Sequence, residues 1–221
     1  MSSILGCTIR PAVVGPGRYH RLVPEVRRAT PEDLDGLTCS LTSAFFDDPV
    51  SAFIFPDAAR RESILREFFV VQLSRTYLSR GEVYTTTEQV GAAMWLPPNA
   101  QFPTIRDQLA YLRVSLSAGR WLSARRLSLT LQRLRPVEDH YYLGGIGVEP
   151  AHQRRGLGTA LMHPGLERCD ARHLGAYLEC STEANTRFYG RLGFRVTREI
   201  RAPRGGPRLW LMWREPYAAA A

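Results

Sequence analysis

GGIGVEPAHQRRGLGTAL, residues 144–161, is the stretch that decides the fold of this 221-residue chain. Apolar residues before the turn, Tyr141, Leu143, Ile146 and Val148, predict a strand over 140–148. Pro150 ends that strand because it lacks a backbone donor. Gly156 and Gly158 then open a predicted helix over 156–172. A helix start presents unpaired N–H groups and the positive end of the helix dipole. With two arginines just before it, this turn is suited to bind an anion, above all a phosphate.

The composition is that of a globular protein, with 44% hydrophobic and 23% charged residues, and it predicts one domain over 25–216. Residues 1–24, rich in Gly, Pro and Arg, are expected to form a flexible leader, and 217–221 a disordered tail. The net charge of +8 favours anionic ligands or partners. We expect neither a nucleic-acid nor a membrane partner, because no basic motif with interleaved aromatics and no membrane-length apolar run is present.

The four cysteines are scattered along the chain and show no CxxC spacing. This pattern is not typical of a zinc site or of a disulfide framework. We therefore expect no metal and a cytoplasmic location.

Helical and strand patterns alternate along the chain and predict the α/β class. A first strand is expected at 25–29, and a helix follows it with Thr30 as N-cap and Pro31 in its first position. A second helix is expected at 57–79, stopped by Gly81, and an aromatic and acidic connector covers 45–56 between the two helices. Further strands are expected at 82–87, 90–96, 140–148, 175–180, 194–200 and 208–213, and further helices at 156–172 and 183–192.

The segment 104–135 is helical in pattern, with a break near Gly119, and it is rich in arginine. Its seven arginines are Arg106, Arg113, Arg120, Arg125, Arg126, Arg133 and Arg135. They form either the solvated face of amphipathic helices or a basic docking surface.

The order Gln153-x-x-Gly156-x-Gly158 after a strand resembles the signature of the GNAT superfamily of acetyl-CoA-dependent acetyltransferases. Within that superfamily the chain is similar to the puromycin N-acetyltransferase type. Three further stretches carry the resemblance, which spans about 26–214: YLECST (177–182), NTRFYGRLGF (185–194) and WLM (210–212). It implies a GNAT fold, in which a mixed, mostly antiparallel sheet is flanked by helices. The sheet would be splayed between its fourth and fifth strands, at 140–148 and 175–180.

The resemblance implies an acetyl-CoA site in that splay. Backbone N–H groups of the glycine turn would hold the pyrophosphate, with charge-assisted contacts from the arginines, and the strand end would pair with the pantetheine amides. The implied cofactor-binding residues are Ile146, Gly147, Val148, Gln153, Arg154, Arg155, Gly156, Leu157, Gly158, Thr159, Asn185 and Tyr189. Many relatives have glycine in place of Arg154. In the alternative interpretation the two helix-opening glycines only permit close packing and the arginines are only solvated.

Tyr189 is the candidate general acid. A phenol has an ordinary pKa of about 10, so it keeps its proton at neutral pH and can give it to a departing thiolate. The alternative is a tyrosine that only packs in the core.

The general base is expected on a different strand from that of many relatives. Many members of the superfamily use a glutamate on the fourth strand, where this chain has Gly144 and Gly145. Glu179, on the next strand, matches a glutamate of the puromycin-type relatives and is the expected base. Asp47 and Asp48 are alternatives or amine anchors, and a helix-end or turn role fits both equally well.

The acceptor site is expected to involve acidic and aromatic side chains. The candidate substrate-binding residues are Asp47, Asp48, Phe46, Glu179 and Trp210, and other aromatics that could shape the pocket are Phe53, Phe55, Trp95, Tyr111 and Tyr142. Core packing is the alternative for the aromatic residues.

The sequence thus predicts direct transfer of an acetyl group from acetyl-CoA to a primary amine of a small molecule. The transfer would take place in a ternary complex on a monomer or homodimer. Acetylation of protein lysines or N-termini and a non-catalytic acyl-CoA-binding module remain alternatives. The acceptor itself is not identified, because acceptor pockets diverge faster than cofactor sites within one fold.

Overall fold

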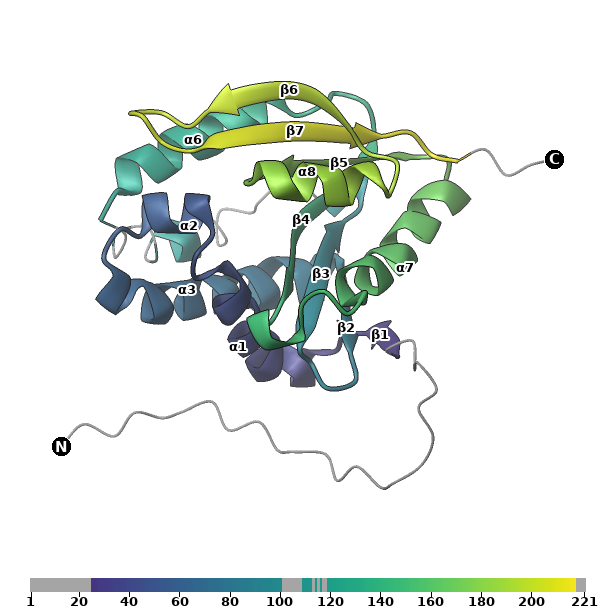
Figure 1. The fold of residues 1–221 in the computed structure, drawn as a ribbon, viewed down its shortest axis with the longest axis horizontal. Coiled ribbons are helices and arrows are strands. Elements are labelled where there is room, and N and C mark those ends of the chain that lie inside the picture. Colours follow the sequence, from purple (N-terminus) through teal and green to yellow (C-terminus); the bar gives the residue numbers. More distant parts are fainter. Residues whose placement is uncertain (1–24, 101–108, 113, 115, 117–118, 218–221) are drawn as a thin grey trace.

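A seven-stranded sheet forms the centre of the computed structural model, which describes residues 25–100, 109–112, 114, 116 and 119–217 (Figure 1). The strand order is β1-β2-β3-β4-β5-β7-β6, and among the described strands only β4 and β5 pair in parallel. The strands are β1 (Val26–Arg28), β2 (Glu82–Thr86), β3 (Gly91–Leu96), β4 (His140–Val148), β5 (Gly175–Cys180), β6 (Arg195–Arg201) and β7 (Arg208–Arg214). The predicted α/β class and mixed, mostly antiparallel sheet are confirmed. The predicted leader and residues 218–221 lie outside the described residues.

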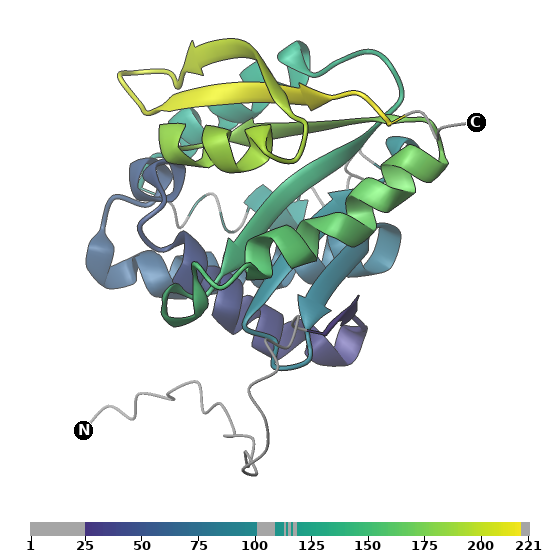
Figure 2. The same cartoon turned by 45° about the vertical axis from the view of Figure 1, so that its right-hand side comes forward.

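Helices cover both faces of the sheet (Figures 1 and 2). α7 (Leu157–Ala171) and α8 (Glu183–Gly190) lie on one face, and α1 (Leu34–Phe45) and α3 (Ala58–Gln72) on the other. α6 (Trp121–Leu134) packs through Leu127 against the end of the sheet that carries β6 and β7. The short elements are η1 (Pro31–Asp33), α2 (Pro49–Ile54), η2 (Leu73–Tyr77), α4 (Leu78–Arg80), η3 (Pro98–Ala100) and η4 (Pro150–His152).

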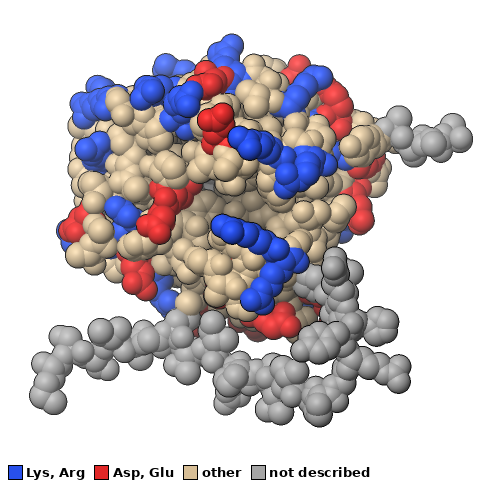
Figure 3. All heavy atoms as spheres, in the orientation of Figure 1, with Lys and Arg blue, Asp and Glu red and all other residues tan. Residues whose placement is uncertain are grey.

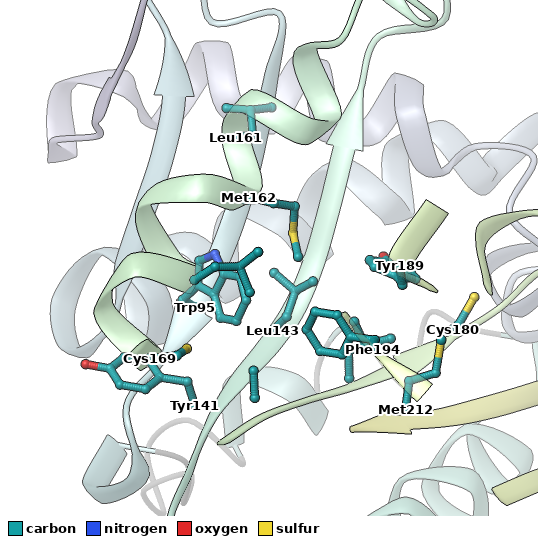
Figure 4. Close-up of a cluster of buried hydrophobic side chains, with 14 of the residues drawn as sticks. Trp95, Tyr141, Leu143, Leu161, Met162, Cys169, Cys180, Tyr189, Phe194 and Met212 are labelled. Carbon is teal, nitrogen blue, oxygen red and sulfur yellow. The ribbon is translucent and has the colours of Figure 1, made fainter. Parts of the chain in front are cut away.

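The largest buried cluster fills the space between α7, α8 and the sheet (Figure 4). Trp95, Tyr141 and Leu161 are fully buried there, and Tyr189 lies at the α8 side of the cluster. A second cluster, which includes Leu37, packs α1 and α3 against the opposite face. Because both faces of the central strands are covered, the side chains of β3 are all buried.

Two predicted elements differ from the structure. The single helix expected at 57–79 is α3 followed by η2, a π-helical turn, and by α4. Gly81 follows as the C-cap, with an extended φ of −113°, so the helical segment ends at the predicted residue. Apolar spacing does not reveal a π turn, because one wider turn barely disturbs the pattern of the flanking helix.

The connector expected at 45–56 contains the helix α2. Asp48 is its N-cap, with Oδ1 accepting from the N–H groups of Val50 and Ser51 at 2.9 and 3.1 Å, and Pro49 occupies the first position. Both signals are present in the sequence, but the aromatic residues around them led to the prediction of a connector instead of a short helix.

Candidate functional site

β4 and β5 separate part of the way along their length. Their parallel pairing runs only from His140 opposite Gly175 to Leu143 opposite Leu178. On the other side of β4, the register with β3 shifts between Met94 and Trp95 and leaves Gly144 without a Cα partner. Gly144 is therefore a bulge at the point where the two parallel strands part. The predicted splay is confirmed, and we call it the opening.

The main chain of β4 is unpaired along the opening. Just after β4, the N–H of Glu149 donates to the carbonyl of Val90, the residue before β3, at 2.9 Å. Since alternate residues of an antiparallel strand bond to the same neighbour, Ile146 and Val148 turn their main-chain groups away from β3, toward the opening. The side chain of Gln153 donates to the Val148 carbonyl at 3.0 Å and ties the strand end to the turn that follows.

Gly147 lacks a side chain for a packing reason. A Cβ at this position would lie 2.9 Å from the Ala44 Cβ and 3.0 Å from the Leu41 Cδ2 of α1. This glycine lets α1 approach β4, so the structure gives it a scaffold role beside the expected cofactor role.

The glycine turn ends in an uncapped helix start. Gly156 is the N-cap of α7, with φ of +83° and open space where a Cβ would stand, and it receives the first helical bond from Ala160 at 3.0 Å. The N–H groups of residues 157–159 have no intrahelical partner, and no side chain caps them among the described residues. Arg154 and Arg155 beside them are exposed, and Arg154 holds φ of +60°, which is uncommon outside glycine. This is a helix start with unused donors and positive charge, suited to an anion.

The face that carries the turn is hollowed at its centre, with basic side chains along the border of the hollow (Figure 3). The position of the hollow matches that of the opening and of the start of α7 in the same view (Figure 1).

α8 borders the opening on the α7 side. The Oγ1 of Thr182 caps it by accepting from the Asn185 N–H at 3.2 Å, and Asn185 itself is exposed. The ring of Phe188 lies 3.4 Å from the position of a Cβ on Gly158. This distance is an ordinary van der Waals contact, so the packing of α8 does not by itself require glycine at 158.

Tyr189 is a buried side chain with an unused hydroxyl. It is 8% exposed and packs against Phe188 and Phe194, with ring centroids 5.1 and 5.9 Å away. No group in the described part of the chain hydrogen-bonds to its hydroxyl. Burial raises the pKa of this phenol well above its usual value, so it keeps its proton at neutral pH.

Glu179 lies just beyond the last residue of β5 that pairs with β4. Side chains alternate along a strand, so Leu178 and Cys180 face the cluster that contains Tyr189, while Glu179 and Tyr177 face the other side. The phenol and the carboxylate thus stand at one opening on opposite faces of the sheet.

The Glu179 carboxylate is 8% exposed and half satisfied. Oε2 accepts from the Tyr142 hydroxyl at 2.7 Å, while Oε1 lies 3.9 Å from the Arg135 Nη2 and has no hydrogen bond of ordinary geometry to a described residue. Burial raises the pKa of the carboxyl above its ordinary value, although Arg135 and Tyr142 oppose that rise. Arg135 in turn stacks over the Tyr142 ring, with its Cζ 4.0 Å from the centroid.

Sequence reasoning missed Arg135 and Tyr77 as members of this site. Tyr77 ends the π turn η2, and a Cβ on Gly144 would overlap its hydroxyl oxygen. The one available signal was the glycine at 144, which leaves room for a side chain from elsewhere. Nothing distinguished Arg135 from the other arginines of its segment, and two of those, Arg106 and Arg113, lie outside the described residues.

The remaining candidate acceptor residues have other contacts. The second carboxylate oxygen of Asp48 accepts from the Ser181 hydroxyl, which joins α2 to the end of β5. Asp47 is exposed, and Phe46 is half-buried with the Arg61 guanidinium 5.2 Å from its ring centroid. Trp210 is 9% exposed within the cluster of Tyr189, which favours core packing.

Metal-ligand clusters and membrane-spanning helices are both absent from the described part of the chain. No group of three or more His, Cys, Asp or Glu residues there is arranged to hold a metal ion. No helix there is both long enough and apolar enough to span a membrane.

The comparisons with known proteins agree on one family. Residues 126–194 match the model of the acetyltransferase (GNAT) family, and this range contains the opening, the turn and α8. The chain is 26% identical over 205 residues to an uncharacterised N-acetyltransferase of Schizosaccharomyces pombe, covering 86% of this chain and 83% of that protein.

Solved structures share the fold. A structure described as histone acetyltransferase HPA2 and related acetyltransferase from Corynebacterium glutamicum has a TM-score of 0.67 at 22% identity, covering 90% of this chain and 99% of that one. The polyamine N-acetyltransferase of Drosophila melanogaster, which forms N-acetylagmatine, has a TM-score of 0.57 at 18% identity, covering 86% and 99%. These relatives do not test the puromycin-type resemblance, which stays a prediction.

Proposed function

The chain belongs to the GNAT superfamily of acetyltransferases, and we propose that it transfers the acetyl group of acetyl-CoA directly to a primary amine of a small molecule. One observation carries the proposal. A buried phenol and a buried carboxylate, Tyr189 and Glu179, flank one opening from opposite faces, next to an unused anion site.

The residues of the opening fit acetyl-CoA. The free N–H groups at the start of α7, with Arg154 and Arg155, would hold the pyrophosphate. The outward main chain at Ile146 and Val148 would pair with the pantetheine amides, and the exposed Asn185 would bond the same arm. When bound, acetyl-CoA supplies an acetyl group activated as a thioester.

Glu179 and Tyr189 would handle the protons of the transfer. An ammonium group gives one proton to Glu179 and becomes a nucleophilic amine. The nitrogen–carbon bond then forms as the carbon–sulfur bond breaks. Tyr189 gives its proton to the departing sulfur, and the second proton lost from the nitrogen restores the phenol. Because the two groups lie on opposite faces, the base and the acid would reach the reacting atoms from different sides, while the amine nitrogen comes within about 3–3.5 Å of the thioester carbon for direct transfer.

Acetylation of a protein lysine or N-terminus is the second candidate. The name of the C. glutamicum structure favours it for that protein, whereas the Drosophila enzyme acts on a small amine. In this chain the carboxylate is only 8% exposed, enclosed by Tyr142 and Arg135. A base enclosed in this way favours a small acceptor that can enter the site over a polypeptide that must lie across it.

Two measurements test the proposal. Isothermal titration should show acetyl-CoA binding, and a thiol-release assay over small primary amines, a lysine peptide and a free N-terminal peptide should show turnover with the small amines. Absence of acetyl-CoA binding by the folded protein would refute the proposal. Turnover with the peptides alone would establish the second candidate, and binding without thiol release from any acceptor would indicate a non-catalytic module.

A further inference from the structure

We propose that the acceptor carries a carboxylate group near its amine, and that Arg135 binds this carboxylate beside Glu179. The inference rests on the proposed function and narrows its acceptor class to small aminocarboxylates, such as amino acids.

Arg135 is a mostly buried cation that makes no hydrogen bond to a described residue. It follows α6 directly, and its side chain is 20% exposed. Its closest carboxylate oxygen, Glu179 Oε1, is 3.9 Å from Nη2, which is beyond hydrogen-bonding distance. Its Nε is fully buried and unpartnered within the described part of the chain. A guanidinium has five N–H donors. Leaving the buried Nε donor unused is unfavourable, so an added acceptor would complete the site.

Two other polar atoms at this place make no hydrogen bond of ordinary geometry. The Oε1 of Glu179 and the hydroxyl of Tyr177 are buried without such a bond among the described residues, although the two groups are close enough to shift each other's pKa. The Tyr77 hydroxyl lies against Gly144 at the same point of the sheet. One acceptor and several donors therefore surround the position where β4 and β5 part, which is an arrangement suited to a ligand that both donates and accepts.

The charge balance favours a ligand with a negative group. Arg135 and Glu179 together are neutral. An ammonium brings a charge of +1, and transfer of its proton to Glu179 leaves that net charge in place, now centred on Arg135. A carboxylate on the same molecule makes the filled site neutral before and after the proton transfer. Since net charge in a poorly solvated site is unfavourable, a zwitterionic acceptor is favoured over a simple amine.

A carboxylate also matches the geometry of the arginine. The Cζ of the guanidinium lies over the Tyr142 ring, 4.0 Å from its centroid. This contact restricts the position of the guanidinium, and its planar fork of donors fits the two oxygens of a carboxylate.

Pairs of acceptors that differ only in the carboxylate test the inference: L-phenylalanine with 2-phenylethylamine, and L-methionine with 3-(methylthio)propylamine. Thiol release is measured at saturating acetyl-CoA. For the wild-type enzyme we expect kcat/KM to be on the order of 100-fold higher for the acid of each pair, the effect of a charge-assisted bidentate contact. Equal or better use of the amines that lack the carboxylate would overturn the inference while leaving the proposed acetyl transfer intact.

Arg135→Met supplies the second readout, because methionine keeps the apolar stem and removes the charge. We expect it to lower kcat/KM for the acids by about 30- to 100-fold more than for the simple amines, which lose activity only through the effect of the Arg135 charge on the pKa of Glu179. The matched control is Arg133→Met, at an exposed position of α6, and it should change neither acceptor class. An equal loss for both classes in Arg135→Met would overturn the inference. If that variant does not fold, as judged by circular dichroism, the wild-type comparison decides alone.

Discussion

Tyr189→Phe should separate turnover from stability. The hydroxyl that it removes belongs to a side chain that is 8% exposed, and it has no hydrogen-bond partner in the described part of the chain. The substitution therefore leaves no buried partner unsatisfied, which would otherwise cost about 1–3 kcal/mol. We expect the free energy of unfolding to stay the same or to rise by up to about 1 kcal/mol. Turnover should fall by about 10²–10⁴-fold, the usual contribution of a general acid.

Tyr141→Phe is the matched control. The Tyr141 hydroxyl is buried and has no hydrogen-bond partner among the described residues. Tyr141 belongs to the same hydrophobic cluster, but it lies on the part of β4 that pairs with β5, opposite Ala176. The chemical change is therefore identical and the distance from the opening differs. We expect a similar small effect on stability and full turnover.

The assay for both variants combines thiol release at saturating substrates, titration of acetyl-CoA affinity and urea unfolding. The reasoning is refuted if Tyr189→Phe keeps wild-type turnover, or if its turnover falls only in proportion to its acetyl-CoA affinity. It also fails if Tyr189→Phe destabilises the fold clearly while Tyr141→Phe does not, because the hydroxyl would then have a structural partner.

Three further substitutions test other parts of the structure. Burial raises the pKa of Glu179, and its ionised form is the base, so wild-type kcat/KM should fall as the pH drops through that raised pKa. Glu179→Gln should lose this acidic limb of the pH profile and about 10²-fold or more in activity. Arg214→Met should lower the free energy of urea unfolding by about 3–5 kcal/mol, because Arg214 is 2% exposed and pairs with both Asp170 oxygens at 2.8 and 2.7 Å. Gly144→Ala should lower the free energy of urea unfolding by about 1–3 kcal/mol, because a Cβ at 144 would clash with Tyr77. A Tyr77→Leu background should remove that loss, because the backbone at 144 has no left-handed φ that would itself disfavour alanine. Additive effects in this pair would contradict the proposed contact.

The anion site could be predicted from sequence because its signals are local. Strand, proline, glycine turn and helix start follow one another within 144–161, and each has a direct backbone consequence. The structure places the left-handed φ at Gly156 and the unused donors after it, as the pattern indicated. The splay between β4 and β5 was reached through the family resemblance, and the pairing confirms it.

The acceptor side could not be predicted in the same way because its contacts are tertiary. Arg135 meets Glu179 only because α6 ends beside β5, and Tyr77 meets Gly144 only because a π turn ends there. No residue pattern encodes either approach. The Asp48 carboxylate shows the converse case: its residue type suggested an amine anchor, and the structure uses both oxygens for a helix cap and for Ser181.

The location of the carboxylate follows from packing. Many relatives place a glutamate on the fourth strand, but a side chain at Gly144 would meet the Tyr77 hydroxyl, so that position is closed here. Position 179 is the first residue of β5 that no longer pairs with β4, and its side chain faces away from the Tyr189 cluster. A carboxylate there can reach the opening from the face opposite the phenol without displacing Tyr77. The glycine at 144 makes room for Tyr77, and the glutamate at 179 supplies the carboxylate that position 144 cannot hold. An active enzyme with Glu at 144 would therefore require Tyr77 to be replaced by a smaller residue as well.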